Sequence, residues 1–498
     1  MDQEQIRQWL RRLNTQEILP EDFESAIFLS TDADRVLDYV FESPGLSEMR
    51  GASEQLKGLN DVSFVSSLLA SPEIALPPQS LIYTGGGSII VLAPRSSRPA
   101  IETLKRELER HYPEETGAAT VTCVLMEASP EKVQQDFGEL VSEAGIKLRL
   151  AKAQKQQRPN FEVLPFTRRC DACRKRPAVM FVHPYEDQPP EGRCRVCVEK
   201  WRKGRDARSA WHERQAPQDL EEIGGASQGA IGVIYADGNG VGDWIQGATT
   251  IAEFRQRSDL VATAMKRALK TALRTWAAQL PFEVILVGGD DVLLIVPAGI
   301  ALWVARDLCA TFESEMQKYA KTMSAGVAFA DHHTPVYFLR RLVNKLLKET
   351  KRHQTGSAVD FLVLKSQGTR TIDEAWETYT FPDTGEQLIL HGGPYALPEL
   401  DKLLERIQEG KGKNYPRSQL YGLRETFKQG RQASALAFLY QKARSKQEYK
   451  AFLSRFADDW CQSERETAPW FLSHTLRGGI KVYCTAWADM ADLWDWIG

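Results

Sequence analysis

Residues 288–291, Gly-Gly-Asp-Asp, place two carboxylates at a tight turn between two short apolar runs. The runs, 284–287 and 292–295, are rich in Val, Ile and Leu, as buried strands are. The glycines let the backbone reverse sharply and let a large ligand approach closely. Adjacent carboxylates repel each other unless a cation lies between them, and Mg²⁺ and Mn²⁺ favour carboxylate and phosphate oxygens. A polar hairpin tip explains the same residues, because Gly-Asp is common turn chemistry.

A third carboxylate, Asp237, follows the apolar run 230–236 and precedes Gly238, Asn239 and Gly240. A strand ending in Asp, followed by a Gly-rich bend into a helix through Trp244, offers a metal ligand and backbone N–H groups for phosphate. A helical pattern over about 260–280 then leads to the acidic hairpin. This is the order of a polymerase or nucleotidyl-cyclase palm. We therefore predict that Asp237, Asp290 and Asp291 hold two divalent ions that activate an attacking hydroxyl and hold the leaving pyrophosphate.

The sequence pattern of the hairpin occurs a second time in the chain, without the acids. Residues 81–92 repeat the pattern with Gly-Gly-Gly-Ser at 85–88, and Pro94 and Pro297 follow at matching offsets. The strand 26–30 precedes this copy, and Thr31 falls roughly where Asp237 falls in the other. Asp32 and Asp34 are nearby, but the hairpin supplies no carboxylates to complement them. This copy is expected to keep the fold without two-metal chemistry and to serve as a partner surface that closes the active copy.

The elements that must position these acids form an α+β fold with two ferredoxin-like palm domains. After the acidic hairpin we expect a helix over 301–319, a strand over 324–329, a helix over 336–351 and a strand over 360–364. The last helix carries Lys345, Lys348 and Lys351, one of which could reach a triphosphate, although each is also explained as a surface lysine. The expected domains are an N-terminal helix (1–25), a first palm (26–150), a zinc module with linkers (151–229), the active palm (230–370) and a helical domain (371–498).

Four of the eight cysteines form a metal-binding pattern. Cys170 and Cys173 make one C-x₂-C knuckle, and Cys194 and Cys197 make the other, with 20 residues between the knuckles. This spacing is typical of a zinc ribbon, in which four thiolates close a tetrahedral structural site. Such a site holds together a segment too short to bury its own core. Redox pairing is the rival interpretation. The remaining cysteines are expected to be buried thiols: Cys123, Cys309, Cys461 and Cys484.

Composition and charge limit the other function classes. The formal net charge is −3, and no apolar run approaches the roughly 20 residues that span a membrane. The N-terminus is polar and acidic, so we expect a cytoplasmic protein without a secretory signal. Residues 402–450 hold twelve Lys and Arg but four Asp and Glu, which suggests a nucleic-acid backbone or an acidic protein partner. A basic run over 200–208 is equally consistent with a solvated helix face. The expected core anchors in the helical domain are Trp460, Trp470, Trp487, Trp494 and Trp496.

With these motifs in order, the chain resembles the large palm-domain subunit of type III CRISPR effector complexes, nearest the type III-B form. The resemblance covers nearly the whole chain. It is carried by Asp-Tyr-Val-Phe-Glu-Ser-Pro at 38–44, Met-Arg-Gly-Ala-Ser at 49–53 and Tyr-Ala-Asp-Gly-Asn at 235–239. The Gly-Gly-Asp-Asp hairpin, the four cysteines between the palms and the helical C-terminal region complete the pattern.

The resemblance implies an activity and its partners. Such subunits bind target RNA through a guide RNA, within a multi-subunit ribonucleoprotein, and polymerise ATP into 3′–5′ cyclic oligoadenylates. It implies Mg²⁺ or Mn²⁺ on Asp237, Asp290 and Asp291. It also implies nucleotide contacts from a set of nearby residues: Gly238, Asn239, Gly240, Gly288, Gly289, Ser258 and Lys351. Ser258 would lie near the base. The choice of adenine over guanine rests on the family alone.

The chain departs from many family members at its N-terminus. The first palm begins about 26 residues in, and none of the eight histidines directly precedes an aspartate, so we expect no His-Asp nuclease domain. Asp331-His332-His333 follows a palm strand and is expected to be a loop. Two alternatives remain open: the same site makes another product, such as a cyclic dinucleotide or an AMP conjugate, or the chain is a catalytically silent RNA-complex scaffold. A diguanylate cyclase is disfavoured because Val292 follows the acids and a second palm is built into the chain.

Overall fold

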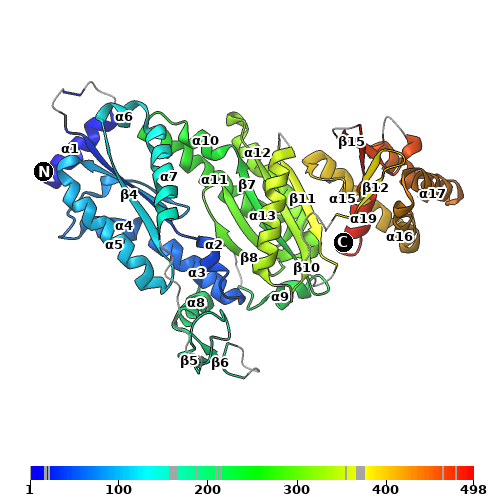
Figure 1. Cartoon of the computed structure of the whole chain (residues 1–498), viewed down its shortest axis with the longest axis horizontal. Coiled ribbons are helices and arrows are strands. Elements are labelled where there is room, and N and C mark those ends of the chain that lie inside the picture. The colour runs from blue at the N-terminus through cyan, green and yellow to red at the C-terminus, as the bar shows by residue number, and fades with distance from the viewer. Residues whose placement is uncertain are drawn as a thin grey trace. The chain divides into compact units, whose positions relative to one another are not determined.

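The computed structural model describes residues 2–15, 19–20, 23–155, 166–184, 189–207, 211, 216–353, 356–365, 376–461, 465–476 and 479–497. These residues form two compact units. The first comprises Met1–Asp219, Gly240–Lys266 and Val284–Val292, and the second comprises Leu220–Asn239, Arg267–Glu283 and Leu293–Gly498. The predicted α+β fold is confirmed (Figure 1). No helix in the described ranges combines the length and the apolar character that a membrane span requires.

The first palm is a four-stranded sheet in the order β2-β3-β1-β4. Its strands are β1 (Ala26–Ala33), β2 (Leu81–Gly85), β3 (Ser88–Pro94) and β4 (Val121–Ala128). β1 pairs antiparallel with both β3 and β4, and Asp32 lies opposite Ser88. The helices α5 (Arg98–Thr116) and α7 (Phe137–Gln154) pack on β1 and β4. Further helices are α1 (Gln3–Asn14), α2 (Val36–Val40), α3 (Leu46–Leu59), α4 (Val62–Ala70) and α6 (Pro130–Gln135).

The second sheet repeats this order and extends it, as β14-β11-β10-β7-β9-β8. Its strands are β7 (Ala230–Asn239), β8 (Glu283–Val287), β9 (Asp291–Pro297), β10 (Thr322–Asp331), β11 (Ala358–Val363) and β14 (Tyr395–Ala396). The helices α12 (Ala301–Met316) and α13 (Val336–His353) pack on β7 and β10 (Figure 1). The segment before β7 contains α9 (Leu220–Gly225), and the segment after it contains α10 (Val241–Gln246) and α11 (Ile251–Trp276). The last part of the predicted zinc module with linkers (151–229) is therefore partly helical.

The small zinc module is built on α8 (Arg195–Asp206) and the hairpin of β5 (Met180–Val182) and β6 (Glu191–Arg193). α8 lies against α3 of the first palm at two glycines. A Cβ on Gly204 would come within 1.7 Å of the Ser47 carbonyl oxygen, and one on Gly51 within 1.8 Å of the Lys200 carbonyl oxygen. The two helix backbones therefore touch, and only glycine fits at these positions.

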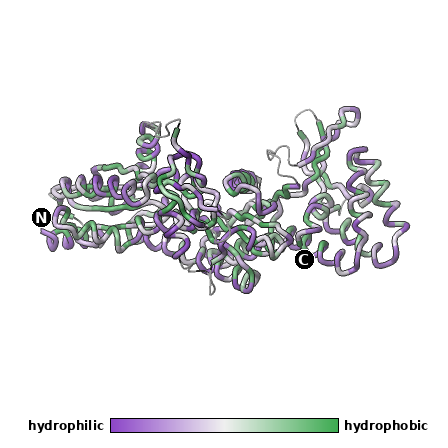
Figure 2. The backbone as a smooth tube through the Cα atoms, turned by 90° about the horizontal axis from the view of Figure 1, so that it is seen from below, coloured by the Kyte–Doolittle hydropathy of each residue, from purple (hydrophilic) through white to green (hydrophobic). Residues whose placement is uncertain are grey.

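The C-terminal region is helical, as predicted, but it also contains a sheet. Its helices are α15 (Leu397–Gly412), α16 (Arg417–Glu425), α17 (Arg431–Arg444), α18 (Gln447–Trp460) and α19 (Ala486–Leu493). The sheet has the order β12-β13-β16-β15, from Thr378–Phe381, Glu386–Ile389, Lys481–Cys484 and Phe471–Thr475. Apolar and polar segments alternate along the helices (Figure 2), and in α15 the apolar positions Leu400, Leu403 and Leu404 are buried. Such amphipathic helices are held mainly by the packing of one face.

The predicted tryptophan anchors divide into two groups. Trp470, Trp487 and Trp494 are buried, so these predictions are confirmed. Trp460 and Trp496 are only half-buried, so their prediction as core anchors is wrong. Trp460 is the last residue of α18 and packs against Phe456 in a tilted arrangement, with 4.9 Å between the ring centroids. A helix terminus leaves one side of such a ring open to solvent.

A buried charged network links the palm sheet to the C-terminal region. The His391 ring lies between two carboxylates, with Nε2 2.8 Å from Asp360 Oδ1 and Nδ1 2.7 Å from Asp489 Oδ1. Trp376 stacks on this ring with 4.2 Å between the centroids. Burial disfavours the charged imidazole, but the negative charges of Asp489 and Asp360 outweigh it and raise the pKa of His391 to about 10. His391 therefore carries a positive charge in the folded protein at neutral pH.

Candidate metal and nucleotide site

Asp237 lies near the end of β7, and its carboxylate forms an ion pair with a lysine. Lys351, in the last turn of α13, places Nζ 2.5 Å from Asp237 Oδ2 and 2.8 Å from the carbonyl oxygen of Gly238. Both side chains are partly exposed, at 27% for Lys351 and 31% for Asp237, so the pair is accessible to exchange with solvent ions. A carboxylate and a carbonyl oxygen converging on one cation is the donor chemistry that Mg²⁺ and Mn²⁺ use. The residues present therefore fit a divalent ion.

The strand continues further than the sequence indicates. β7 runs through Gly238 and Asn239, which pair with Met323 and Thr322 of β10, and the left-handed turn comes at Gly240 with φ 62°. The Asn239 side chain donates to Thr322 Oγ1 at 2.9 Å and to Ser324 Oγ at 3.0 Å. Gly238 and Asn239 are thus strand residues and not the expected Gly-rich bend. Their contact with phosphate stays a prediction, as does that of Gly240.

The acidic hairpin has the predicted strand-turn-strand form. β8 ends at Val287 and β9 starts at Asp291, and the Gly288 N–H donates to the Asp291 carbonyl at 2.9 Å. The reason for the glycine differs from the expected one. Gly288 and Gly289 have ordinary negative φ angles, whereas Gly86 and Gly87 of the first hairpin have φ of 57° and 87°. A Cβ on Gly288 would lie 2.0 Å from Asp291 Oδ1. Gly288 therefore makes room for a carboxylate, not for a left-handed backbone.

The first palm contributes a side chain beside this hairpin that sequence reasoning missed. The hydroxyl of Tyr83, on β2, lies 4.0 Å from the position that a Cβ on Gly289 would take. Burial raises the pKa of Tyr83, and the negative charges of Asp290 and Asp259 add to the effect. Ser258, which was expected near the base, is buried on α11 and directly precedes Asp259 in the sequence. Its contact with the base stays a prediction. Tyr83 occupies a hairpin position where the second copy has Leu286, which is the one sequence signal for it.

The first palm repeats the lysine arrangement of the second, which corrects the residue match. Lys152 Nζ lies 2.7 Å from Asp32 Oδ2 and 2.9 Å from the carbonyl oxygen of Ala33. Lys152 is in the last turn of α7, as Lys351 is in the last turn of α13. The counterpart of Asp237 is therefore Asp32, and the expectation that Thr31 corresponds to it is wrong by one residue.

The residue two positions after each of these aspartates matches as well. Asp34 accepts hydrogen bonds from Thr120 Oγ1 at 2.8 Å and from Thr122 Oγ1 at 2.7 Å. Asn239 makes the corresponding contacts to Thr322 and Ser324. Lys155 then pairs with Asp34 at 2.7 Å. In the first palm two lysines thus neutralise two acids, and no metal ion is needed to balance the charge at this strand end.

The four predicted zinc ligands come together. Cys170, Cys173, Cys194 and Cys197 are buried, with their sulfur atoms within 4.8 Å of one another. Cys173 Sγ and Cys194 Sγ are 3.8 Å apart. Tetrahedral zinc with Zn–S bonds of about 2.3 Å places sulfurs about 3.8 Å apart, so the donor set fits zinc. No disulfide joins any cysteine in the described residues, and Cys123, Cys309, Cys461 and Cys484 are buried thiols, as expected.

A second layer of contacts ties this cluster to the first palm. Ser43 Oγ lies 3.1 Å from Cys197 Sγ. Lys200 on α8 is fully buried, with Nζ 2.6 Å from the Tyr39 carbonyl oxygen and 3.3 Å from Glu42 Oε2. Burial lowers the pKa of Lys200, and the charge of Glu42 opposes that shift. Part of the basic run over 200–208 is therefore structural, whereas Arg208 lies outside the described residues.

Other candidate residues have separate places. Asp331 is the last residue of β10 and not part of the expected loop, which begins at His332 and His333. Because Asp331 pairs with Ala230, these residues lie at the far end of β7 from Asp237. Lys348 is exposed on α13.

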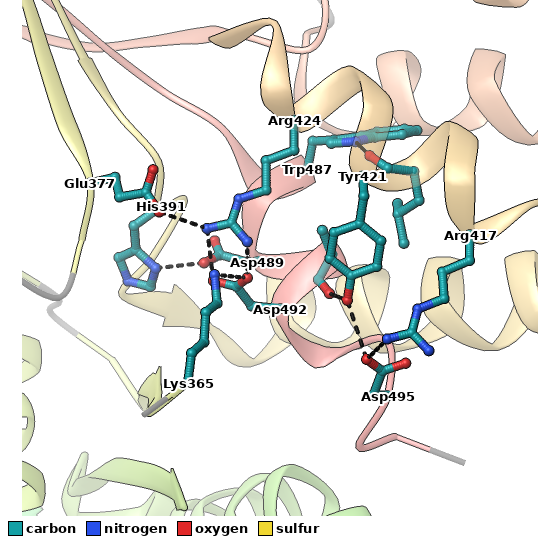
Figure 3. Close-up of polar contacts among 12 residues, drawn as sticks. Lys365, Glu377, His391, Arg417, Tyr421, Arg424, Trp487, Asp489, Asp492 and Asp495 are labelled. Carbon is teal, nitrogen blue, oxygen red and sulfur yellow. Dashed lines mark hydrogen bonds and ion pairs between the residues drawn. The ribbon is translucent and has the colours of Figure 1, made fainter. Parts of the chain in front are cut away.

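The basic excess over 402–450 is partly paired with acids from elsewhere in the chain. Arg424 contacts Asp492 and Glu377, and Arg417 contacts Asp495 (Figure 3). Lys365 reaches the same Asp492 at 2.6 Å. All of these residues except Arg417 line a cavity of about 550 Å³ between α16, α19 and the ends of β11 and β12. The excess of positive charge counted along the segment is thus reduced by folding.

Comparison with known proteins agrees with this fold. Residues 230–358 match the family model of "Cas10/Cmr2, second palm domain". This range contains Asp237, the acidic hairpin and Lys351. No curated protein is similar enough in sequence to match.

Several solved structures share the fold. A Csm1-Csm4 cassette in complex with cA4 is 15% identical, with a TM-score of 0.52 over 70% of this chain and 55% of the other. A Csm1-Csm4 subcomplex of the type III-A CRISPR-Csm interference complex is 14% identical, with a TM-score of 0.51 over 70% and 55%. Csm1 of T. onnurineus is 16% identical, with a TM-score of 0.50 over 68% and 53%. The chain thus spans about half the length of these proteins. Residues 230–358 therefore match a second palm domain of the Cas10/Cmr2 family.

Proposed function

We propose that this chain is the nucleotidyltransferase subunit of a type III CRISPR effector complex, and that it polymerises ATP into cyclic oligoadenylates when target RNA is bound. The observation that carries the proposal is the family match over 230–358, a range that holds Asp237, Asp290 and Asp291 together with Lys351. Similarly folded Csm1-Csm4 cassettes have been solved with AMPPNP and with cA4, which supports an adenine nucleotide as substrate.

The repeated palm supports the meeting of the three acids. In the first palm Asp32 lies opposite Ser88 in the strand register. Asp32 corresponds to Asp237 through the shared lysine contact, and Ser88 corresponds to Asp291 in the hairpin alignment. The same register in the second palm would set Asp237 opposite Asp291. Two strands of an antiparallel pair bring such opposite side chains within about 5.5 Å.

In this proposal the protein supplies positioning and charge, and no protein nucleophile. Asp237, the Gly238 carbonyl, Asp290 and Asp291 would hold two divalent ions, which lower the pKa of a 3′-hydroxyl and neutralise the triphosphate. Asn239 fixes the end of β7 through its contacts with Thr322 and Ser324, so the carboxylate of Asp237 stays in place. Lys351 offers a positive charge to the triphosphate.

The test uses the full chain assembled with guide RNA, target RNA and the partner subunits of the complex. Labelled ATP with Mn²⁺ is expected to give 3′–5′ cyclic oligoadenylate, identified by mass and by nuclease sensitivity. Asp237→Asn and the double variant Asp290→Ala/Asp291→Ala should lower the rate at least about a hundredfold, since loss of an ion removes several kcal/mol of charge stabilisation. Asp32→Asn, the same change in the first palm, should retain the product.

Three other results would point elsewhere. RNA binding without ATP turnover would favour the scaffold function, and a cyclic dinucleotide or an AMP conjugate would favour another product of the same site. Product formation that survives Asp290→Ala/Asp291→Ala would remove the hairpin from the chemistry.

A further inference from the structure

Two lysines hold the same pair of oxygens in the two palms. Lys351 contacts Asp237 Oδ2 and the Gly238 carbonyl, and Lys152 contacts Asp32 Oδ2 and the Ala33 carbonyl, all at 2.5–2.9 Å. Each lysine lies in the last turn of a helix that comes after the fourth strand of its palm. Lys351 is on α13, after β10, and Lys152 is on α7, after β4 and the short helix α6. The repetition shows that the strand end is built as a cation-binding position, in which an ammonium group is the present cation.

The charges around the two positions differ. In the first palm Asp34 adds a second carboxylate, and Lys155 balances it at 2.7 Å. In the second palm the neutral Asn239 occupies that place, and Lys351 contacts Asp237. The first position is therefore closed by an internal balance of two acids and two lysines. The second is held by one partly exposed ammonium on a flexible stem, which can leave.

An ammonium and a divalent ion exclude each other at this position. Mg²⁺ bonds oxygen at about 2.0–2.1 Å, closer than the ammonium contacts, and its double charge repels a lysine on the same two oxygens. Loading the ion on Asp237 and Gly238 therefore requires Lys351 to move away. The triphosphate that arrives with the ion offers the ammonium a new anionic partner.

We propose that Lys351 is a place-holding cation, which occupies the divalent-ion position on Asp237 and Gly238 in the unloaded protein and exchanges to the incoming triphosphate when metal and nucleotide bind. This inference rests on the proposed function, because it assumes that Asp237 is a metal ligand. It makes Lys351 a positioning residue whose removal has opposite effects on the two ligands. Metal alone should bind more tightly without the lysine, whereas the nucleotide should bind more weakly.

The test measures Mn²⁺ binding to the full chain by electron paramagnetic resonance of the free ion, without nucleotide. Lys351→Met should lower the Mn²⁺ dissociation constant about fivefold, the gain expected when a competing exposed ion pair is removed. Lys152→Met makes the same change at the matched position, where the hairpin offers Ser88 in place of an acid, and should leave Mn²⁺ binding unchanged. In a second titration with a non-hydrolysable α,β-methylene analogue of ATP and Mg²⁺, Lys351→Met should weaken nucleotide binding about tenfold.

The outcomes separate this inference from the proposed function. Asp237→Asn should abolish one Mn²⁺ site. If it changes nothing, Asp237 is not a metal ligand and both proposals fail. If the Asp237-dependent site exists but Lys351→Met leaves its affinity equal or weaker, the place-holder role is overturned while the proposed function stands. An equal gain in Lys152→Met would also overturn it, because the effect would then be a general consequence of removing a lysine. Tighter Mn²⁺ with weaker nucleotide binding is a pair of changes that damage to the fold would not produce.

Discussion

Replacing Gly288 with alanine tests whether this glycine exists to make room for a metal-binding carboxylate. A Cβ at position 288 would lie 2.0 Å from Asp291 Oδ1 and 3.2 Å from Asp291 Cγ. Real Cβ atoms essentially never approach a neighbour closer than 3.0 Å. The carboxylate must therefore retreat by about 1 Å, the scale of misplacement that is costly at a reacting centre.

The expected effect falls on catalysis and not on folding. A displacement of about 1 Å at a reacting group costs on the order of 10²-fold in rate, or about 2.7 kcal/mol in activation free energy. Asp291 is half-buried at a hairpin end, so its side chain can rotate away without disturbing the sheet. The melting temperature of Gly288→Ala should stay close to that of the unchanged protein.

The assay compares ATP turnover in the assembled complex with thermal unfolding of the same preparations. Gly242→Ala is the matched control, since a Cβ there meets nothing within 4 Å. Turnover by Gly288→Ala as fast as by Gly242→Ala would show that position 288 need not make room for the Asp291 carboxylate. Loss of turnover together with a large fall in melting temperature would also contradict this role, because the glycine would then serve the fold.

Three further predictions concern stability. The folded pKa of His391 is raised from 6.5 to about 10, so its contribution is complete below about pH 6.5 and is lost as the pH rises toward 10. In denaturant titrations, the protein's unfolding free energy minus that of His391→Gln should fall by on the order of 4 kcal/mol across this pH window. A difference that does not change with pH would contradict a charged His391. Gly204→Ala should cost about 3 kcal/mol because its Cβ would lie 1.7 Å from the Ser47 carbonyl oxygen, whereas Gly58→Ala, with nothing within 4 Å, should be neutral or slightly stabilising in the same thermal scans. Elemental analysis should find one zinc per chain. Removing the zinc with a chelator or by Cys197→Ser should unfold the α8 module, measured as loss of amide protection in hydrogen exchange. Retained protection would contradict a structural zinc site.

Features encoded locally could be predicted from the sequence. The two hairpins, the strand that leads to Asp237 and the four-cysteine cluster each depend on residues close together in the chain or on a strict spacing. The repeat of the hairpin also fixed the number of palm sheets. The sheet orders β2-β3-β1-β4 and β8-β9-β7-β10 bear this out, because related sequences fold to related topologies.

Contacts between distant residues could not be predicted in the same way. Lys152 reaches Asp32 across 120 residues, and Lys351 reaches Asp237 across 114. No spacing rule selects these lysines from their neighbours on the same helix, since the choice depends on where the helix ends against the sheet. The one-residue error that matched Thr31 to Asp237 has the same origin.

The C-terminal region shows a second limit. Its short strands, such as β13 and β16, pair in parallel from segments about a hundred residues apart, and runs of four residues carry little periodicity. The positive charge of α16 seemed free in the sequence because Asp492 and Asp495 lie far along the chain on and after α19. Counting charge within a window cannot show such pairing.

We propose that folding brings Asp237, Asp290 and Asp291 together around two divalent ions. The most direct measurement is a crystal structure of the full chain with Mn²⁺ and a non-hydrolysable ATP analogue, with the ions located by anomalous scattering. We expect two Mn²⁺ ions about 3.5–4 Å apart, held by the carboxylates of Asp237 and the hairpin, with the Lys351 ammonium on the triphosphate. Mn²⁺ ions bound elsewhere, with the Asp237 carboxylate too far from both hairpin acids to share an ion, would contradict it.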